Sequence, residues 1–186
     1  MHSVDLPEDQ EIPQPALERL SNVPPINIYR LLAIVPQAVI PWTDLTQAVY
    51  ECGLDARLRE IAICRQARTA NAGYELHQHQ FIARNNGVSE AELEAVLHEP
   101  TVGSLDESAN LVCQVADELE RGATLSDETF DRLYGAFGRQ NATELLFILS
   151  FYCAVARLSN STRIPIEQEN PLLASSNPTV QSAAKR

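Results

Sequence analysis

The chain has 186 residues, of which 45% are hydrophobic, and a formal net charge of -11. This length suffices for a single domain to bury a core without help from metals or disulfides. The acidic balance argues against a nucleic-acid partner, because phosphates would be repelled. An anionic small molecule would need a locally basic pocket.

The start of the sequence, residues 1–9, lacks the basic residues and apolar run of a signal peptide. The most apolar stretch, residues 145–156, is shorter than a bilayer requires and is typical of a buried core helix. We therefore expect a cytoplasmic protein with no membrane partner.

Three regions follow one another along the chain. Residues 1–25 hold five prolines and many acids, which predicts an extended arm that wraps a neighbour. Residues 26–169 carry helical patterns and are expected to form the folded domain. Residues 170–186 are rich in Ser, Pro and Ala, which predicts a flexible tail.

The domain is expected to be entirely helical, because strand-type alternation is missing and the glycines fall mostly at helix boundaries. Asp55 should cap one helix, and Gly87 should end the next in a left-handed conformation. Capping boxes are expected at Ser89 and again at Ser104. The fold class is thus an all-α bundle of about eight helices. In chain order, we expect helices at residues 27–36, 42–53, 55–69, 73–86, 89–98, 104–122, 126–137 and 142–158.

The segment 72–79 places two imidazoles and a carboxylate within two helical turns, in a chain that has four histidines in all. Glu75 and His79 are four residues apart, so they share one helix face and can touch. Such a pair is either structural or an acid/base unit for proton transfer near neutral pH. His77 points about 200° away from His79 and should belong to another surface. One imidazole with two acids is a weak ligand set, so no metal is expected.

Glu60 lies in the preceding helix, close to apolar neighbours. The chain reverses near residues 71–73, and antiparallel packing would bring Glu60 to the face that carries Glu75 and His79. The alternative is a surface carboxylate paired with Arg57 or Arg59.

The four cysteines are far apart and form no CxxC pattern. Apolar helical neighbours predict buried free thiols in a reducing compartment. A redox pair brought together by folding is the alternative. These residues are Cys52, Cys64, Cys113 and Cys153.

Five segments together resemble the carboxymuconolactone decarboxylase family, which includes the AhpD-like proteins. The resemblance covers roughly residues 27–167 and implies the AhpD-like helical fold. Family members form trimers or hexamers, which implies a homo-oligomer here. The segments are residues 58–63, 74–79, 83–93, 151–158 and 164–167.

The peroxidase branch of this family has a glutamate followed, after eleven residues, by Cys-x-His-Cys-x-x-x-His. Glu60 and His79 match its ends, but Ala72 and Glu75 stand where the two cysteines belong, and Tyr74 replaces the inner histidine. A thiol peroxidase needs those thiols. Peroxidase activity is therefore disfavoured, and a version using distant cysteines such as Cys52 and Cys64 is the least favoured alternative.

The decarboxylase branch resembles this chain more closely, through Glu75, His79 and the segment Asn86–Ser89. The resemblance implies a cofactor-independent acid/base enzyme, acting by decarboxylation or related proton transfer on a small carboxylated or lactone-like substrate. It implies His79 as the acid, with Glu75 and Glu60 orienting it. A non-catalytic ligand-binding or structural oligomer is the alternative. The expected substrate-binding residues are Tyr74, Arg68 and Arg84.

Overall fold

The computed structural model describes residues 2–168 and 171–173, and all regular structure within them is helical. This confirms the all-α class with about eight helices. Most of the tail expected at 170–186 lies outside the described residues; Pro171–Leu173 form a short 3-10 turn. The helices are α1 (Gln14–Leu20), α2 (Asn27–Leu32), α3 (Pro36–Glu51), α4 (Ala56–Thr69), α5 (Gly73–Asn85), α6 (Glu90–His98), α7 (Glu107–Gly122) and α8 (Asp127–Thr162).

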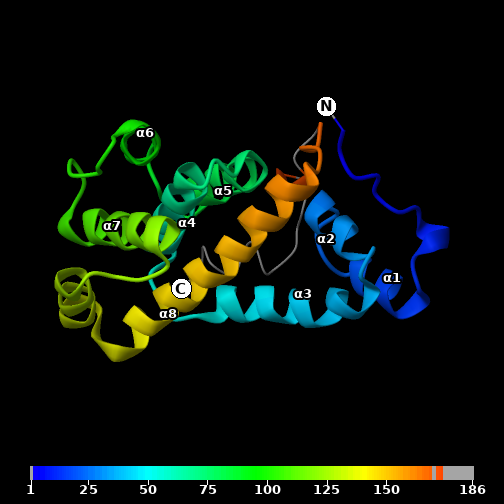
Figure 1. The fold of residues 1–186 in the computed structure, drawn as a ribbon, viewed down its shortest axis with the longest axis horizontal. Helices are drawn as coiled ribbons and strands as arrows, with labels where there is room; N and C mark the ends of the chain where they lie inside the picture. Colours follow the sequence, from blue (N-terminus) through cyan, green and yellow to red (C-terminus); the bar gives the residue numbers. More distant parts are fainter. Residues whose placement is uncertain (1, 169–170, 174–186) are drawn as a thin grey trace. The chain divides into compact units, whose positions relative to one another are not determined.

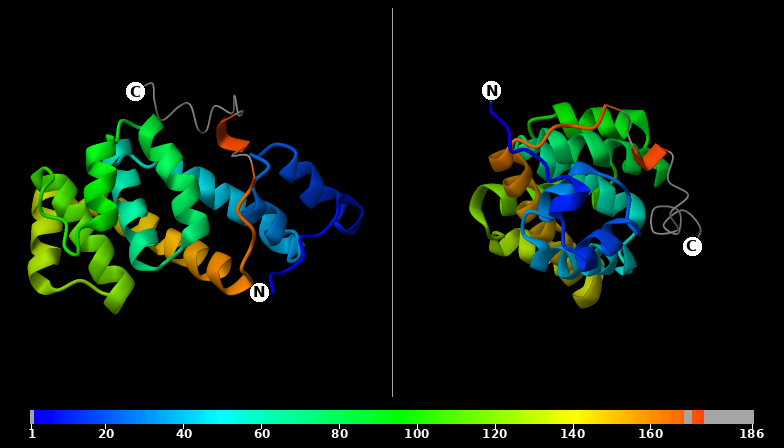
Figure 2. Two further views of the ribbon diagram at one scale, coloured as in Figure 1. Left: turned by 90° about the horizontal axis from the view of Figure 1, so that it is seen from above. Right: turned by 90° about the vertical axis from the view of Figure 1, so that its right-hand side faces the viewer.

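The chain divides into two compact units. One comprises residues 1–51 together with 159–186, and the other comprises residues 52–158. In the second unit, α4 packs against α5, α6 and α7 (Figures 1 and 2). Because three helices cover α4, ten consecutive residues from Leu58 to Ala67 are buried. A helix buried on nearly all sides must find internal partners for every charged side chain that it carries.

Local sequence signals place the ends of these helices. Asp55 accepts a hydrogen bond from the backbone N–H of Leu58 and caps α4. Ser89 and Glu92 form the expected capping box of α6. Gly87 has φ +86°, the left-handed conformation that glycine adopts without the penalty of a Cβ atom. These three predictions are confirmed.

The second capping box, predicted at Ser104, is wrong. The Ser104 hydroxyl donates instead to the carboxylate of Glu99. Asp106 takes the N-cap position of α7 and accepts from the backbone N–H of Ala109. The helix therefore begins three residues later than expected.

Pro41 does not separate two helices as expected. It lies inside α3, and α2 ends at Leu32. A proline removes one backbone hydrogen bond, here the bond to the carbonyl of Gln37 in the first turn of α3. Gln37 is exposed, which leaves water available to that carbonyl. The helix continues because Val39, Thr43 and Val49 bury one of its sides.

The expected break between helices at 126–137 and 142–158 occurs within α8, at Gly138. This residue has φ 69° and ψ 173°, which no helix contains. Of the helices in the described residues, α8 is the one whose length and composition would allow it to cross a membrane. Half of its most apolar window is buried inside the protein, as in a core helix.

In the first unit, α3 packs against α1 and α2. The arm predicted to be extended is helical at α1, with a 3-10 turn at Asp9–Glu11 before it. The prolines do not prevent this, because Pro13 and Pro15 lie at the start of α1, where a missing N–H costs little. Glu167 accepts a hydrogen bond from the backbone N–H of Asn27, tying the segment after α8 to the start of α2.

Candidate acid–base site

Glu60 on α4 and His79 on α5 meet inside the second unit. The Oε2 atom of Glu60 lies 2.8 Å from Nδ1 of His79. Glu60 is fully buried and His79 is 5% exposed. The approach expected from the chain reversal at residues 71–73 is thus present, because α4 and α5 pack along each other.

Arg59 completes the surroundings of this carboxylate. Its Nε donates to the other oxygen of Glu60, Oε1, over 2.9 Å, and Arg59 itself is 2% exposed. Burial raises the pKa of Glu60, but the hydrogen bond and charge of His79, together with Arg59, outweigh burial and lower it. Glu60 is therefore a buried carboxylate with a partner at each oxygen.

The carboxylate of Glu60 also orients the ring of His79. With Nδ1–H donating to Glu60, a neutral imidazole carries its lone pair on Nε2, which can then accept a proton. The ring of Tyr152 on α8 packs edge-on against His79, with centroids 4.6 Å apart and planes at 83°. Phe151 packs in turn against Tyr152, with centroids 5.2 Å apart. The arrangement resembles the carboxylate–histidine pairs that enzymes use as general bases.

Glu75 is not the partner of His79, and this expectation is wrong. Its carboxyl group is buried, with the residue 1% exposed, and neither oxygen has a hydrogen-bond partner. Burial, followed by the negative charge of Glu120, raises the pKa of Glu75 well above its ordinary value of 4.5. Spacing of four residues allowed the contact, but Nδ1 of His79 faces the carboxylate of Glu60 on α4, whose other oxygen accepts from Arg59.

The two arginines expected to bind substrate lie outside this contact. Arg84 is exposed and pairs with Glu90, and exposed Arg68 donates to the carbonyl of Leu97. Tyr74 is buried in the first turn of α5. His77 is exposed, on another surface from His79 as predicted.

Sequence reasoning missed two members of the site. The sequence predicts Arg59 only as a surface partner of Glu60, because the charged sequence of α4 does not reveal that the helix is buried on nearly all sides. The sequence shows Tyr152 only as a member of residues 151–158, one of the segments that resemble the family. The run of apolar residues around Tyr152 signalled a central helix, but no local pattern shows that its ring contacts His79.

The four cysteines are free thiols, and two of them are buried beside the charged residues of α4 and α7. Burial, with the nearby carboxylates Glu60 and Glu75, raises the pKa of Cys64 well above its ordinary value. Burial also raises the pKa of Cys113 to about 12. Thiols with raised pKa values are poor nucleophiles at neutral pH. Within residues 2–168 and 171–173, no group of three or more His, Cys, Asp or Glu side chains is placed to hold a metal ion.

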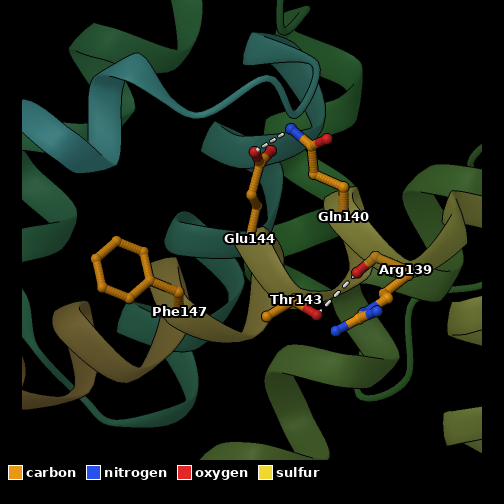
Figure 3. Close-up of a pocket in the computed structure, with 5 residues that line it drawn as sticks. All are labelled: Arg139, Gln140, Thr143, Glu144 and Phe147. Atoms are coloured by element: carbon orange, nitrogen blue, oxygen red, sulfur yellow. Dashed lines mark hydrogen bonds between the residues drawn. The ribbon is translucent and has the colours of Figure 1, made fainter.

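A cavity of about 540 Å³ lies along α8, apart from the Glu60–His79 contact (Figure 3). None of the predicted site residues lines it. Within it, Glu144 accepts hydrogen bonds from the side chain of Gln140 and from the backbone N–H of Leu54. The residues that line it are Arg139, Gln140, Thr143, Glu144 and Phe147.

Comparison with known proteins agrees with this architecture. Residues 36–118, which include α4, α5 and α6, match the model of the carboxymuconolactone decarboxylase family. No curated protein matches the sequence. The structure is similar to the alkylhydroperoxidase AhpD core of an uncharacterized peroxidase-related protein from Ralstonia eutropha JMP134, with a TM-score of 0.79 and 17% sequence identity. The match covers 91% of this chain and 94% of that one, and it concerns the fold.

The matched region contains Arg59, Glu60, Glu75 and His79, so the buried charged residues of α4 and α5 lie inside the family's own segment. Residues 36–118 therefore match the model of the carboxymuconolactone decarboxylase family, and the chain has an all-α fold similar to that of the AhpD core structure.

Proposed function

We propose that the protein is a cofactor-independent acid/base enzyme that decarboxylates, or moves a proton on, a small carboxylated or lactone-like metabolite. The observation that carries the proposal is the opposite environment of two buried carboxyl groups. Glu60 has a lowered pKa and a partner at each oxygen, whereas Glu75 has a raised pKa and no hydrogen-bond partner. Two carboxyl groups whose surroundings drive their pKa values apart are a common sign of acid and base roles.

In this proposal, Glu60 fixes the orientation of the His79 ring, and Nε2 of His79 exchanges a proton with the substrate. Glu75, in its acid form, is the proton donor. In a decarboxylation, Nε2 of His79 takes the proton of the substrate carboxyl group, the bond between the substrate carbon and that group breaks, carbon dioxide leaves and the electron pair stays on the carbon. A proton from Glu75 then completes the product, and water carries the proton held by His79 back to Glu75. The buried surroundings strengthen each of these electrostatic interactions.

The test is the variant His79→Gln, with His77→Gln as the matched control. Both remove one imidazole from the same helix, but His77 is exposed and His79 is buried against Glu60. Each variant is assayed against a panel of small carboxylated lactones and related acids, by substrate loss and release of carbon dioxide. We expect turnover to be lost in His79→Gln and kept in His77→Gln. Full activity in folded His79→Gln would overturn the proposal.

Two alternatives give different results on the same panel. A non-catalytic binding protein would show ligand-dependent increases in Tm without any turnover. A thiol peroxidase would consume peroxide and lose this activity when Cys52, Cys64, Cys113 and Cys153 are all replaced by serine. The raised pKa values of Cys64 and Cys113 and the absence of cysteine at positions 72 and 75 argue against the peroxidase.

We further propose that the enzyme is a cytoplasmic homo-oligomer, a trimer or hexamer. Free cysteines fit a reducing compartment. In the second unit, Phe130 and Phe147 are exposed by 48% and 39%, and exposed aromatic side chains of this size are common at subunit contacts. Sedimentation or light scattering tests this directly, and a monomer at micromolar concentration would contradict it.

A further inference from the structure

The ring of Tyr152 on α8 closes one side of the His79 imidazole. The two ring centroids are 4.6 Å apart and the ring planes meet at 83°, with Tyr152 4% exposed and His79 5% exposed. Glu60 fixes one atom of the imidazole, Nδ1. A single hydrogen bond leaves the imidazole able to tilt about its Cβ–Cγ bond, because this torsion of histidine has broad minima. A second contact is needed to fix the plane of the ring, and Tyr152 supplies one.

Tyr152 is itself held in place from two directions. The ring of Phe151, 7% exposed, packs against it at 79°, with centroids 5.2 Å apart. One helical turn further along α8, Ala156 packs in a buried cluster with Ala67 of α4 and with Ala72, which precedes α5. Residues four apart share a helix face, so the face of α8 that carries Tyr152 is packed against α4 and the start of α5. The ring of Tyr152 thus has a fixed place without any contribution from the imidazole.

The plane of the imidazole decides which of its nitrogens carries the proton. In the observed plane, Nδ1 faces the carboxylate of Glu60, and the neutral ring keeps its lone pair on Nε2. If the ring of His79 turned over about its Cβ–Cγ bond, a carbon atom would replace Nδ1 beside the carboxylate and the hydrogen bond would be lost. The ring would then no longer be held in one tautomer. Molecules that carry the proton on Nε2 cannot accept another proton there.

We propose that Tyr152 is a positioning residue, whose ring holds His79 in the orientation that directs Nδ1 to Glu60 and leaves Nε2 to exchange a proton. This inference rests on the proposed function and extends the site to α8, beyond the residues 36–118 that match the family model. The contact in the structure is made by the ring of Tyr152. Phenylalanine should therefore replace this residue, whereas an aliphatic side chain should not.

The first experiment follows the tautomer of His79 and needs no substrate. Nitrogen-15 NMR spectra of the histidine rings are recorded at a pH where the rings are neutral, and the spectrum of His79→Gln identifies the signals of His79. In the wild type and in Tyr152→Phe, we expect a protonated Nδ1 and an unprotonated Nε2. In Tyr152→Leu, both signals should move toward the averaged shifts of a tautomer mixture. The matched control is Tyr134→Leu, which should leave the signals unchanged because Tyr134, also on α8, stacks on Phe130 instead.

The second experiment measures kcat and KM for the same variants. Loss of ring orientation in Tyr152→Leu should lower kcat by about ten- to a hundredfold with little change in KM, because the substrate still binds but meets a misplaced Nε2. Tyr152→Phe and Tyr134→Leu should keep the wild-type kcat. A role in stability alone would lower Tm without moving the NMR signals or the kcat measured well below Tm.

The inference is overturned by a protonated Nε2 in the wild type or by an unchanged tautomer in Tyr152→Leu. It is also overturned if Tyr134→Leu has the same effect, if Tyr152→Phe loses the tautomer, or if the tautomer changes and kcat does not. If Tyr152→Leu does not fold, Tyr152→Met, whose flexible side chain refills the space, is read in the same way. Failure of the proposed function is recognised separately, by activity that survives in folded His79→Gln.

Discussion

Glu60 and His79 are separated by 19 positions along the chain, yet Oε2 of Glu60 lies 2.8 Å from Nδ1 of His79 in the interior of the second unit. The contact joins α4 to α5, and Arg59 holds the second oxygen of the same carboxylate. Stability and the proposed chemistry therefore involve the same three side chains. Substitutions here should affect both, and the two effects can be separated by measuring them at different pH values.

The variant Glu60→Gln should destabilise the fold by roughly 3–5 kcal/mol at pH 7, because it leaves the buried guanidinium of Arg59 without its carboxylate. Because folding lowers the pKa of Glu60, its ionised carboxylate stabilises the fold at pH values above the ordinary pKa of 4.5. This stabilisation is lost as the pH falls below 4.5 and through the lowered pKa. Urea unfolding at several pH values measures this. The difference between wild type and variant should shrink in acid.

The control for this prediction is Glu90→Gln. Glu90 pairs with Arg84 at the surface, where both side chains are largely exposed. An exposed ion pair contributes little, so we expect Glu90→Gln to change the free energy of unfolding far less than Glu60→Gln does. Equal effects of the two substitutions would show that Glu60 is not the buried partner of Arg59 and His79.

Glu75→Gln should have the opposite effect on stability. Folding raises the pKa of Glu75 above its ordinary value of 4.5. The free energy of unfolding of the wild type should therefore fall as the pH rises from 4.5 toward the raised pKa. Glutamine resembles the neutral acid and removes this loss. The free energy of unfolding of the variant should therefore rise relative to wild type by up to about 1.4 kcal/mol per pH unit. The turnover of the variant should fall. A pH-independent difference in urea unfolding would contradict the assignment of a neutral Glu75.

The sequence predicts much of this fold, because many helix ends depend on neighbouring residues. Asp55, Gly87 and Ser89 act within one turn of their own positions, so their roles are visible locally. The meeting of Glu60 with the His79 face was also predictable, since a short reversal between two helices favours antiparallel packing.

The partner of His79 was not predictable in the same way. Helical spacing permits a contact with Glu75, and only the packing of α4 beneath α5 decides in favour of Glu60. The role of Arg59 could not be predicted for a related reason. Amphipathic patterning distinguishes the two sides of a surface helix, but α4 is covered by three others and its charged residues face inward. The burial of Arg59 depends on residues far away in the sequence.

A second buried ion pair gives a prediction about the architecture alone. Arg65 binds both oxygens of Asp117 on α7, at 2.8 and 2.7 Å, and donates to the carbonyls of Val96, Glu99 and Pro100 around the end of α6. One guanidinium thus joins three helices. Asp117→Asn should cost roughly 3–5 kcal/mol in urea unfolding.

The matched double variant, Arg65→Met with Asp117→Leu, tests the reason for this cost. It removes both charges together, so no uncompensated ion remains in the interior. It should recover part of the stability that Asp117→Asn loses, although the three carbonyls lose their donor. Additive effects of the two substitutions would show that the residues act independently.

The position of the α7 N-cap can be tested with two alanine substitutions two residues apart. Asp106 accepts from the backbone N–H of Ala109 and also pairs with Arg57, so Asp106→Ala should cost about 1–2 kcal/mol. The hydroxyl of Ser104 contacts Glu99 before the helix begins, and Ser104→Ala should cost well under 1 kcal/mol. Chemical denaturation of both variants at pH 7 separates the two assignments. A larger loss of stability in Ser104→Ala than in Asp106→Ala would support the capping box expected from the sequence.

The pH dependence of the two effects supplies a further check. Backbone and arginine hydrogen bonds lower the pKa of Asp106, so its contribution to stability should disappear as the pH falls below its ordinary value of 3.8. The hydrogen bond from Ser104 lowers the pKa of Glu99, so the smaller contribution of Ser104 should already be lost as the pH falls below the ordinary Glu99 value of 4.5.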